Sequence, residues 1–448
     1  MALGPWRIFL LPAILLFYYL YICMLDIKFI KENPELIKEA ARKKRLEVDV
    51  DRLLALETER LALLSQVEAL RAEQNEASQK ISTAEPDKRA ALIEAMQTVK
   101  QSLQIGEEKL KEVMTEWRAL MLQVPNVPDM AVPEGDDDAA NEEIKVWGEK
   151  PEFDFEPKDH IQLLENLGLI DFKRGAKVAG FRGYVLKGDA VKLQMALWQW
   201  ALDELAKKGF QPMLAPALVR PESFFGTGYL PQGEEDLYKT QDGDFLAGTA
   251  EVATMGYFMD EVVAKEELPK KLVAFSPCFR REAGSHGKDT KGAFRVHEFY
   301  KVEQVALCEA NHEESVRLHE ELLANAEDLM QALNLPYHVV VNSSGDLGLG
   351  QVKKYDLEAW LPSQGKYRET HSISYFHDFQ TRRLNIRYRD NEDKLRFAHS
   401  LNGTALATPR LLIAIVENGQ LADGNIKVPA VLRSYFGKDQ LTSFKSAD

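Results

Sequence analysis

The sequence predicts a large α+β domain preceded by a long antiparallel two-helix coiled-coil arm, and three observations lead to this prediction. Apolar residues recur at alternating spacings of three and four between positions 53 and 120, a pattern typical of coiled coils. A proline-rich, acidic stretch follows, with the composition of a linker. Beyond it, short β-branched runs such as KLVAF and YHVVV alternate with helical segments, which is typical of an α+β domain.

The first feature along the chain is an apolar segment, IFLLPAILLFYYLYICML, at positions 8–25, which contains no charged residue. Its length would let it span a bilayer. As a signal peptide it would have a weak basic start, with only Arg7, and it lacks a small-residue cleavage site. Two interpretations stay open: residues 1–23 anchor the protein to a membrane, or the biological chain starts at Met24 and this hydrophobic extension is not part of it.

The coiled-coil pattern consists of two seams. Positions 53, 56, 60, 63, 67, 70, 74, 77 and 81 form the first, and positions 92, 96, 99, 103, 106, 110, 113, 117 and 120 form the second. The break STAEPD separates them, so we expect the two helices to fold back as a hairpin over about residues 51–122. Roughly thirty residues per helix make a rod of about 45 Å. Periodicity alone favours a dimerisation or spacer coiled coil as much as a recognition arm.

The stretch VPNVPDMAVPEGDDDAANEE separates this arm from the rest of the chain. Prolines followed by a run of acidic residues are typical of linkers. We therefore expect an N-terminal domain at 24–124, a linker at 125–143 and a second domain at 144–448.

The composition limits the classes of partner. A formal net charge of −14 argues against a protein that coats nucleic acid, because binding to phosphates depends on Lys and Arg. Any nucleic acid must meet local basic patches. Cys23, Cys278 and Cys308 fit neither a disulfide framework nor a metal motif, which indicates a reducing, cytoplasmic location. The histidines have no cysteine partners at metal-binding spacing, so we expect no zinc.

The stretch FRREAGSHGKDTKGAFRVHEF, at 279–299, is unusually basic for this acidic chain. Its ends have strand character and its middle is rich in glycine, so it predicts a hairpin with a long loop. Arg280 and Arg295 would face the same side and suit phosphate oxygens. Phe299 offers a ring for a base, and Glu282 an acceptor for an exocyclic amine. These residues indicate a nucleotide site, whereas the alternative is a solvated basic face.

A second glycine-rich stretch, GDLGLG at 345–350, does not have the spacing of a dinucleotide-binding loop. We expect a turn there.

The 279–299 stretch resembles motif 2 of the class II aminoacyl-tRNA synthetases. The segment from Ala190 to Pro216 is similar to their motif 1, which lies at the dimer interface, and LNGTALATPRLLIAIVEN, with Arg410, is similar to motif 3. Within this family, TAEV at 249–252, RETHS at 368–372 and the arm resemble the seryl-tRNA synthetases of bacterial type. The resemblance runs from Met24 to the C-terminus, and MLDIKFIKENPE resembles their usual start.

The resemblance implies an antiparallel-sheet catalytic domain and an ATP-dependent, AMP-forming ligase. Such an enzyme activates L-serine as seryl-adenylate and transfers serine to tRNA(Ser), with tRNA(Sec) as a further candidate substrate. It also implies a homodimer in which the arm reaches across to the tRNA.

Roles of single residues follow from the same resemblance. Arg280, Glu282 and Arg410 would be catalytic, with Arg280 at the α-phosphate. Glu369 and Ser372 would hold Mg²⁺. ATP would be bound by Arg280, Arg281, Glu282, Arg295, Val296, Phe299, Glu369, Thr370, His371, Ser372 and Arg410. L-Serine would be bound by Thr249, Ala250, Glu251, Arg280, Glu303 and Thr404, with Glu303 and Thr404 at its hydroxyl. For Glu303, the alternative is a surface salt bridge to Lys301.

Two other functions remain to be weighed. A synthetase-like ligase that charges a carrier protein would have no need of a heptad-regular arm. A membrane-tethered coiled-coil scaffold would have no use for Arg280, Glu282, Arg295, Glu369 and Arg410.

Overall fold

The computed structural model describes residues 25–284, 287 and 289–443, which separate into two compact units at residue 127. The apolar segment 8–25 lies outside the described residues except for Leu25. Within the described ranges, no helix is both long enough and apolar enough to cross a membrane.

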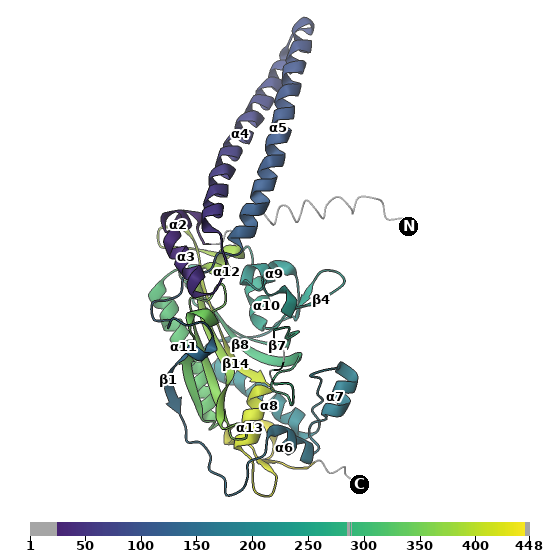
Figure 1. Cartoon of the computed structure of the whole chain (residues 1–448), viewed down its shortest axis with the longest axis vertical. Coiled ribbons are helices and arrows are strands. Elements are labelled where there is room, and N and C mark those ends of the chain that lie inside the picture. Colours follow the sequence, from purple (N-terminus) through teal and green to yellow (C-terminus); the bar gives the residue numbers. More distant parts are fainter. Residues whose placement is uncertain (1–24, 285–286, 288, 444–448) are drawn as a thin grey trace. The chain divides into compact units, whose positions relative to one another are not determined.

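The N-terminal unit contains two short helices and a long helical hairpin. The short helices are α2 (Ile27–Glu32) and α3 (Pro34–Lys43), and the hairpin consists of α4 (Val50–Thr83) and α5 (Pro86–Met121). Asp49 caps α4 by accepting a hydrogen bond from the backbone N–H of Arg52 at 2.8 Å. Pro86 begins α5, since proline is tolerated in the first helical turn. The two long helices lie side by side (Figure 1), which confirms the predicted arm.

The predicted seams form the interface of this hairpin. Every seam position of both helices is buried or half-buried, and Leu56, Leu63 and Val113 form a core. Position 60 of the first seam is a polar residue, Arg60. Its guanidinium pairs with Glu57 at 2.8 Å and lies 5.2 Å from the ring centroid of Trp117. The side chain therefore covers an aromatic ring and keeps its charge paired.

The second unit is built on an eight-stranded sheet with the strand order β1-β9-β10-β11-β14-β8-β7-β2. All neighbouring strands are antiparallel except β2 and β7, which confirms the antiparallel sheet expected from the sequence. The strands are β1 (Glu142–Trp147), β2 (Gln211–Leu214), β7 (Lys270–Phe279), β8 (Glu298–Cys308), β9 (Tyr337–Val341), β10 (Lys353–Leu361), β11 (Lys366–His377) and β14 (His399–Thr408).

Helices cover both faces of this sheet. Val302 and Ala306 of β8 belong to the main core with α8, α11 and α13, whereas Val305 and Leu307 pack with α10 on the other face. This division follows from the alternation of side chains along a strand. The helices are α6 (His160–Asn166), α7 (Phe172–Ala179), α8 (Asp189–Lys207), α9 (Pro221–Thr227), α10 (Ala250–Tyr257), α11 (His312–Ala332), α12 (Phe379–Arg383), α13 (Arg410–Asn418) and α14 (Arg433–Phe436).

Three small sheets complete this unit. They consist of β3 (Leu218–Val219), β5 (Phe245–Leu246) and β4 (Tyr238–Lys239); β13 (Leu395–Phe397), β12 (Arg387–Arg389) and β6 (Val262–Val263); and β15 (Ile426–Lys427) with β16 (Gln440–Leu441).

Bulges in β11 and β14 shift the alternation of their side chains. In β11, Leu357 of β10 is opposite His371 and Glu358 is opposite Glu369, so Thr370 is the extra residue. In β14, Ala405 is extra, because Thr404 is opposite Glu303 and Leu406 is opposite Val302. A bulge places two successive residues on the same face of the sheet.

Candidate active site

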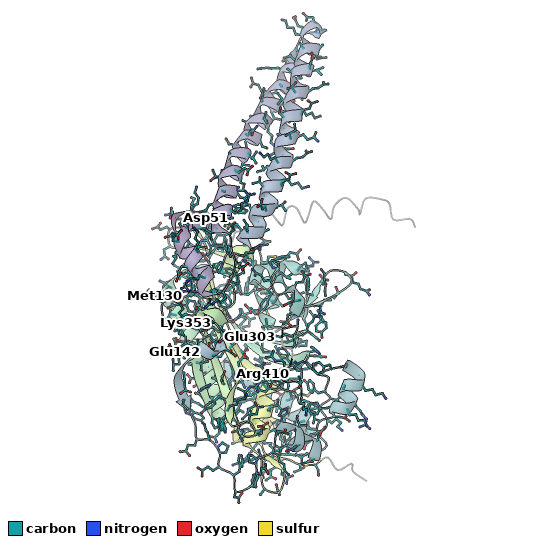
Figure 2. All side chains as sticks on the ribbon, viewed as in Figure 1. Asp51, Met130, Glu142, Glu303, Lys353 and Arg410 are labelled. Atoms are coloured by element: carbon teal, nitrogen blue, oxygen red, sulfur yellow. The ribbon has the colours of Figure 1, made fainter. Side chains whose placement is uncertain are left out.

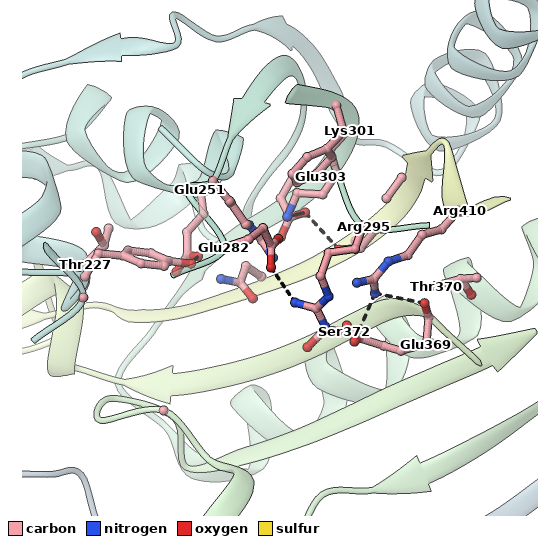
Figure 3. Close-up of a pocket in the computed structure, with 18 of the residues that line it drawn as sticks. Thr227, Glu251, Glu282, Arg295, Lys301, Glu303, Glu369, Thr370, Ser372 and Arg410 are labelled. Carbon is pink, nitrogen blue, oxygen red and sulfur yellow. Dashed lines mark hydrogen bonds and ion pairs between the residues drawn. The ribbon is translucent and has the colours of Figure 1, made fainter. Parts of the chain in front are cut away.

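A cavity of about 330 Å³ lies on the sheet face formed by β8, β11 and β14. Figure 2 labels two of its residues, Glu303 from β8 and Arg410 from the first turn of α13, and Figure 3 shows the site in detail. The structure brings together twelve of the predicted residues on its wall: Glu251, Arg280, Glu282, Arg295, Val296, Phe299, Glu303, Glu369, Thr370, Ser372, Thr404 and Arg410.

One end of the cavity holds a buried charge pair. Lys301 and Glu303 are two apart on β8, so both face the cavity, and their charged atoms are 2.5 Å apart. The hydroxyl of Thr404, on the paired strand, donates to Glu303 Oε2 at 3.3 Å. The side chains of Lys301 and Glu303 are only 8% and 3% exposed. The alternative interpretation of Glu303, a surface salt bridge to Lys301, is therefore wrong about the surface, because the pair is buried in the cavity wall. Burial raises the pKa of Glu303 against the opposing effect of Lys301.

A second buried carboxylate, Glu251, lies in the first turn of α10. Thr249 caps this helix by accepting from the backbone N–H of Glu251 at 3.3 Å. The carboxylate accepts hydrogen bonds from the Tyr229 hydroxyl at 2.9 Å and from the Gln380 amide at 2.6 Å. Burial raises the pKa of Glu251, and Glu303 adds to this effect. Each oxygen has a further lone pair, so the two carboxylates suit a small cationic or hydroxylated group.

The middle of the cavity contains two arginines from the predicted hairpin. Arg280 follows β7, and its guanidinium lies 5.2 Å from the ring centroid of Phe299. No carboxylate of the described residues lies within ion-pair distance of Arg280, so this cation is available to an anion. Arg295 pairs with Glu282 at 2.5 Å. Glu282 has a φ of +56°, a left-handed conformation that is uncommon for residues other than glycine and is often found at functional sites.

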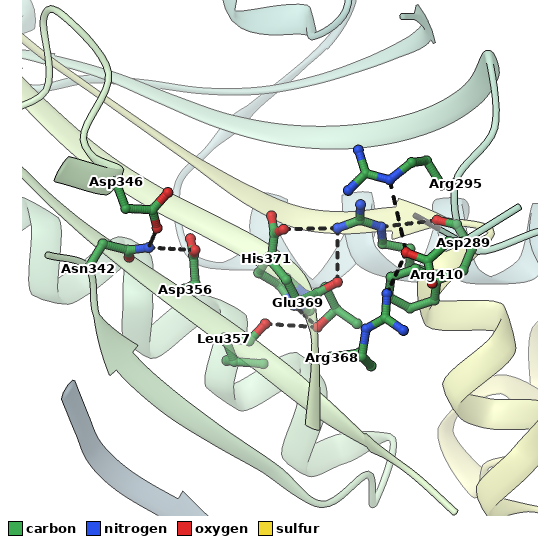
Figure 4. Close-up of polar contacts among 12 residues, drawn as sticks. Asp289, Arg295, Asn342, Asp346, Asp356, Leu357, Arg368, Glu369, His371 and Arg410 are labelled. Carbon is green, nitrogen blue, oxygen red and sulfur yellow. Dashed lines mark hydrogen bonds and ion pairs between the residues drawn. The ribbon is translucent and has the colours of Figure 1, made fainter. Parts of the chain in front are cut away.

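The other end of the cavity holds Arg410 and Glu369. Arg410 Nη1 donates to the backbone oxygen of Glu369 at 3.0 Å and to Glu369 Oε2 at 3.1 Å (Figure 4). Its guanidinium lies 4.7 Å from the ring centroid of Phe294, and Arg368 lies 3.9 Å from the same ring. Burial opposes ionisation of Glu369, but Arg410 and Lys354 outweigh it and hold the pKa of this carboxyl below its ordinary value.

The bulges explain how the strands place these residues. Thr370 and Ser372 face the cavity by simple alternation, and the bulge at Thr370 adds Glu369 to the same face. In β14, Asn402 and Thr404 face the cavity before the bulge and Ala407 faces it afterwards.

Four predicted residues do not line the cavity. Thr249 and Ala250 are buried at the start of α10, and Arg281 is exposed. The His371 side chain is buried between β11 and β14, where Nε2 donates to the backbone oxygen of Ala405 at 3.1 Å. Burial lowers the pKa of His371 to about 4, so the ring is neutral at pH 7.

The cavity also contains residues that the sequence did not single out. Tyr229 and Asn402 line it, and Gln380 holds Glu251 from behind. Asn402 lies inside the stretch LNGTALATPR, so the motif could have identified it. Tyr229 and Gln380 lie outside the motifs, and the residues around them do not indicate a role. The stretch GDLGLG ends in a turn, as expected, and residues 348–351 form part of the wall.

Comparison with known proteins agrees with this arrangement. A family model described as the seryl-tRNA synthetase N-terminal domain matches residues 24–128, and one described as the class II tRNA synthetase core domain (G, H, P, S and T) matches residues 238–419. The chain is similar to a serine–tRNA ligase of Deinococcus radiodurans, with 47% identity over 92% of this chain and 98% of the relative. A serine–tRNA ligase of Thermodesulfovibrio yellowstonii is 45% identical over 93% of this chain and 99% of the relative.

Solved structures show the same likeness. The crystal structure of seryl-tRNA synthetase from Pyrococcus horikoshii complexed with ATP has a TM-score of 0.85 and 40% identity, and the match covers 94% of this chain and 100% of the other. The cytoplasmic serine–tRNA ligase of Naegleria fowleri in complex with AMP has a TM-score of 0.81 and 33% identity over 94% of this chain and 100% of the other. The sequence matches and the shared fold together show that the chain belongs to the seryl-tRNA synthetase family.

Proposed function

We propose that this chain is a serine–tRNA ligase that forms seryl-adenylate from L-serine and ATP and transfers serine to the 3′-terminal adenosine of tRNA(Ser). The observation that carries the proposal is one cavity that joins two buried carboxylates, Glu251 and Glu303, to a row of arginines formed by Arg280, Arg295 and Arg410. The carboxylates suit the amino acid, and the arginines suit the triphosphate.

The first step joins serine to the α-phosphate. A carboxylate oxygen of serine attacks the α-phosphorus, a new P–O bond forms, and the bond to the bridging oxygen breaks so that pyrophosphate leaves. Arg280 neutralises the charge that otherwise separates the carboxylate from the phosphate, and it stabilises the transition state. Arg410 holds the outer phosphates. Most of the rate enhancement comes from positioning and charge, without a covalent enzyme intermediate.

Selectivity for serine comes from the buried acceptors. Glu251 receives the ammonium group, while Glu303 and Thr404 receive the side-chain hydroxyl. Alanine would exclude water from the remaining lone pairs of these acceptors without supplying a hydroxyl to them, which costs binding energy, and the small pocket excludes the extra methyl group of threonine.

The adenine ring stacks on Phe299 and is read by Glu282 and the backbone at Val296. Arg295 supports the assignment of the arginines to the phosphates. Its buried Nε has no hydrogen-bond partner in the described part of the chain and lies 4.0 Å from Asp289 Oδ2, beyond hydrogen-bond distance. A phosphate oxygen would satisfy that donor.

Mg²⁺ fits the donors at Glu369 and Ser372. No group of three His, Cys, Asp or Glu residues among those described could hold a metal ion, but a magnesium ion that arrives on ATP needs only one or two protein ligands beside the phosphates. The carboxylate of Glu369 and the hydroxyl of Ser372 supply such oxygen ligands. When bound, the ion neutralises charge on the phosphates.

The second step transfers serine to RNA in the cytoplasm. A ribose hydroxyl of the terminal adenosine attacks the carbonyl carbon of seryl-adenylate, an ester bond forms, and AMP leaves. The coiled-coil arm recognises the shape and backbone of tRNA(Ser) and also of tRNA(Sec). The enzyme acts as a homodimer. Leu214 on edge strand β2 and Leu218 on the following strand β3 are 77% and 54% exposed, respectively, which favours a second copy at this edge.

The test is amino-acid-dependent exchange between ATP and pyrophosphate, measured with serine, threonine, alanine and glycine and followed by tRNA charging. Serine alone should support strong exchange. Exchange with another amino acid and none with serine would refute the proposal.

A further inference from the structure

A second cavity, of about 410 Å³, lies on the opposite face of β8 from the active site. Side chains alternate along the strand, so Glu298 and Tyr300 line this second cavity while Phe299 and Lys301 line the first. The remaining wall comes from the segment after α7, from α8 and from the β4–β5 region.

The second cavity is lined by aromatic rings. The ring of His297 lies between Phe181 and Tyr238, with edge-to-face centroid distances of 6.5 and 6.4 Å, and Tyr184 lines the cavity beside them. His297 Nδ1 lies 3.0 Å from the backbone oxygen of Arg280. Because a carbonyl only accepts, Nδ1 donates this bond and Nε2 is left as an acceptor. The cavity therefore offers flat apolar surfaces and a hydrogen-bond acceptor.

A buried amide in this cavity has an unused atom. Gln194, on α8, lines the cavity and is 6% exposed. Among the described residues, no group donates a hydrogen bond to its Oε1. A buried acceptor without a donor costs stability, which points to a ligand that carries an N–H group.

The segment that runs from α7 into the cavity wall is basic, in contrast to the net charge of the whole chain. Residues 171–192 contain six Lys or Arg residues and two Asp, whereas the formal charge of the chain is −14. Asp171 pairs with Arg174 at 2.7 Å and with Lys187 at 3.7 Å. Lys173 and Lys177 are exposed one helical turn apart on α7, and neither has an ion-pair partner in the described ranges. Phe181, 61% exposed, follows the end of this helix. A Cβ on Gly175 would lie 2.4 Å from the Tyr184 Cα, so α7 packs closely against the cavity wall.

We propose that this surface binds the acceptor end of the RNA substrate. A nucleobase enters the second cavity and stacks on its rings, its N–H groups reach Gln194 and His297, and neighbouring phosphates meet Lys173 and Lys177. The inference rests on the proposed function. Arg182 connects the surface to the active-site hairpin, because its Nη1 donates to the backbone oxygens of Asp289 at 3.1 Å and Arg295 at 2.9 Å.

The experiment compares three variants with the wild-type enzyme: Lys173→Ala/Lys177→Ala, Phe181→Ala and Gln194→Met. The control is Lys366→Ala/Lys427→Ala, which removes two exposed lysines outside the second cavity and α7. Serine-dependent exchange should stay within about twofold of wild type in every variant, since none of these residues lines the active site.

RNA-dependent measurements should respond. The KM for tRNA should rise about tenfold in the double lysine variant and in Phe181→Ala. In a plot of the logarithm of the RNA binding constant against the logarithm of the salt concentration, the slope should become shallower by roughly one to two in the lysine variant only. Gln194→Met should bind RNA more weakly and yet unfold at a higher temperature, because it removes the unpaired acceptor.

A labelled RNA minihelix with the acceptor stem tests the surface without catalysis. Wild-type binding that the control keeps and the three variants lose would support the inference, even if serine-dependent exchange failed and the proposed function with it. Equal binding by wild type and all variants would overturn it. Weaker dimerisation in Phe181→Ala with unchanged RNA binding would also overturn it, because the cavity would then belong to a subunit contact.

Discussion

Breaking the buried pair between Lys301 and Glu303 is expected to destabilise the catalytic unit strongly. The two charged atoms are 2.5 Å apart, and the side chains are 8% and 3% exposed. Replacing either residue by a neutral one of similar size, Lys301→Met or Glu303→Gln, leaves the other charge buried without its partner. Such a loss costs about 3–5 kcal/mol, which lowers the unfolding midpoint by roughly 6–15 °C in a unit of this size.

The double variant separates this effect from simple loss of packing. Lys301→Met/Glu303→Gln leaves neither charge buried, so its cost should fall short of the sum of the two single costs by about 2–3 kcal/mol. Thermal and denaturant unfolding of the four proteins measures this coupling. Costs that add within about 0.5 kcal/mol would refute the argument.

The pH dependence of Lys301→Met gives an independent check. Burial already raises the pKa of Glu303, and loss of Lys301 should raise it further. The folded state then binds a proton more tightly than the unfolded state, so the stability of this variant should fall as pH rises through the folded pKa. The variant should be closest to wild type near pH 4. A deficit that is constant between pH 4 and 8 would contradict the presence of a buried carboxylate without its cation.

Three further outcomes are expected. Deleting residues 51–122 should abolish tRNA charging and leave serine-dependent exchange within a few-fold of wild type; loss of both would contradict the division between the units. Chelation of divalent cations should stop serine-dependent exchange, and excess Mg²⁺ should restore it. The variant Glu369→Gln should need about tenfold more Mg²⁺ for the same rate. An unchanged Mg²⁺ titration would exclude Glu369 as a ligand. Burial lowers the pKa values of His319 and His371 to about 4, so the free energy of unfolding should fall as pH drops from about 6.5 towards 4, by up to about 3 kcal/mol per histidine. The variant His371→Asn should make this pH dependence shallower in unfolding experiments. An unchanged pH dependence would refute the role of His371.

The arm could be predicted almost completely, because its signal is local. A helix repeats its contacts every few residues, so the spacing of Leu56, Leu63 and Val113 already indicates which positions meet. Even the charged residue Arg60 in the first seam can be explained, because its guanidinium lies over the ring of Trp117 in the second seam.

The catalytic unit could be predicted only where a motif is continuous along the chain. Residues 280–303 reach the same cavity because one hairpin carries them. Tyr229 and Gln380 meet Glu251 from 22 and 129 residues away, and no pattern along the chain encodes such a contact. Residues 128–141 show the same limit: their composition is typical of a linker, yet Asp129 accepts a hydrogen bond from Tyr375 and the backbone oxygen of Pro133 accepts one from Ser344.

The bulges at Thr370 and Ala405 restrict how these two strands can change in length. Removing the extra residue of a bulge leaves both flanking segments on their present faces, whereas removing a neighbouring residue turns every side chain on one side of the gap to the opposite face. The hydrogen bond from His371 to Ala405 ties the two bulges together, so a deletion in one strand also removes support from the other. Phe376 is a further extra residue of β11, in its pairing with β14. Deletions in the two strands should therefore be tolerated at Thr370, Phe376 and Ala405 before other positions, and variation elsewhere should consist of substitutions.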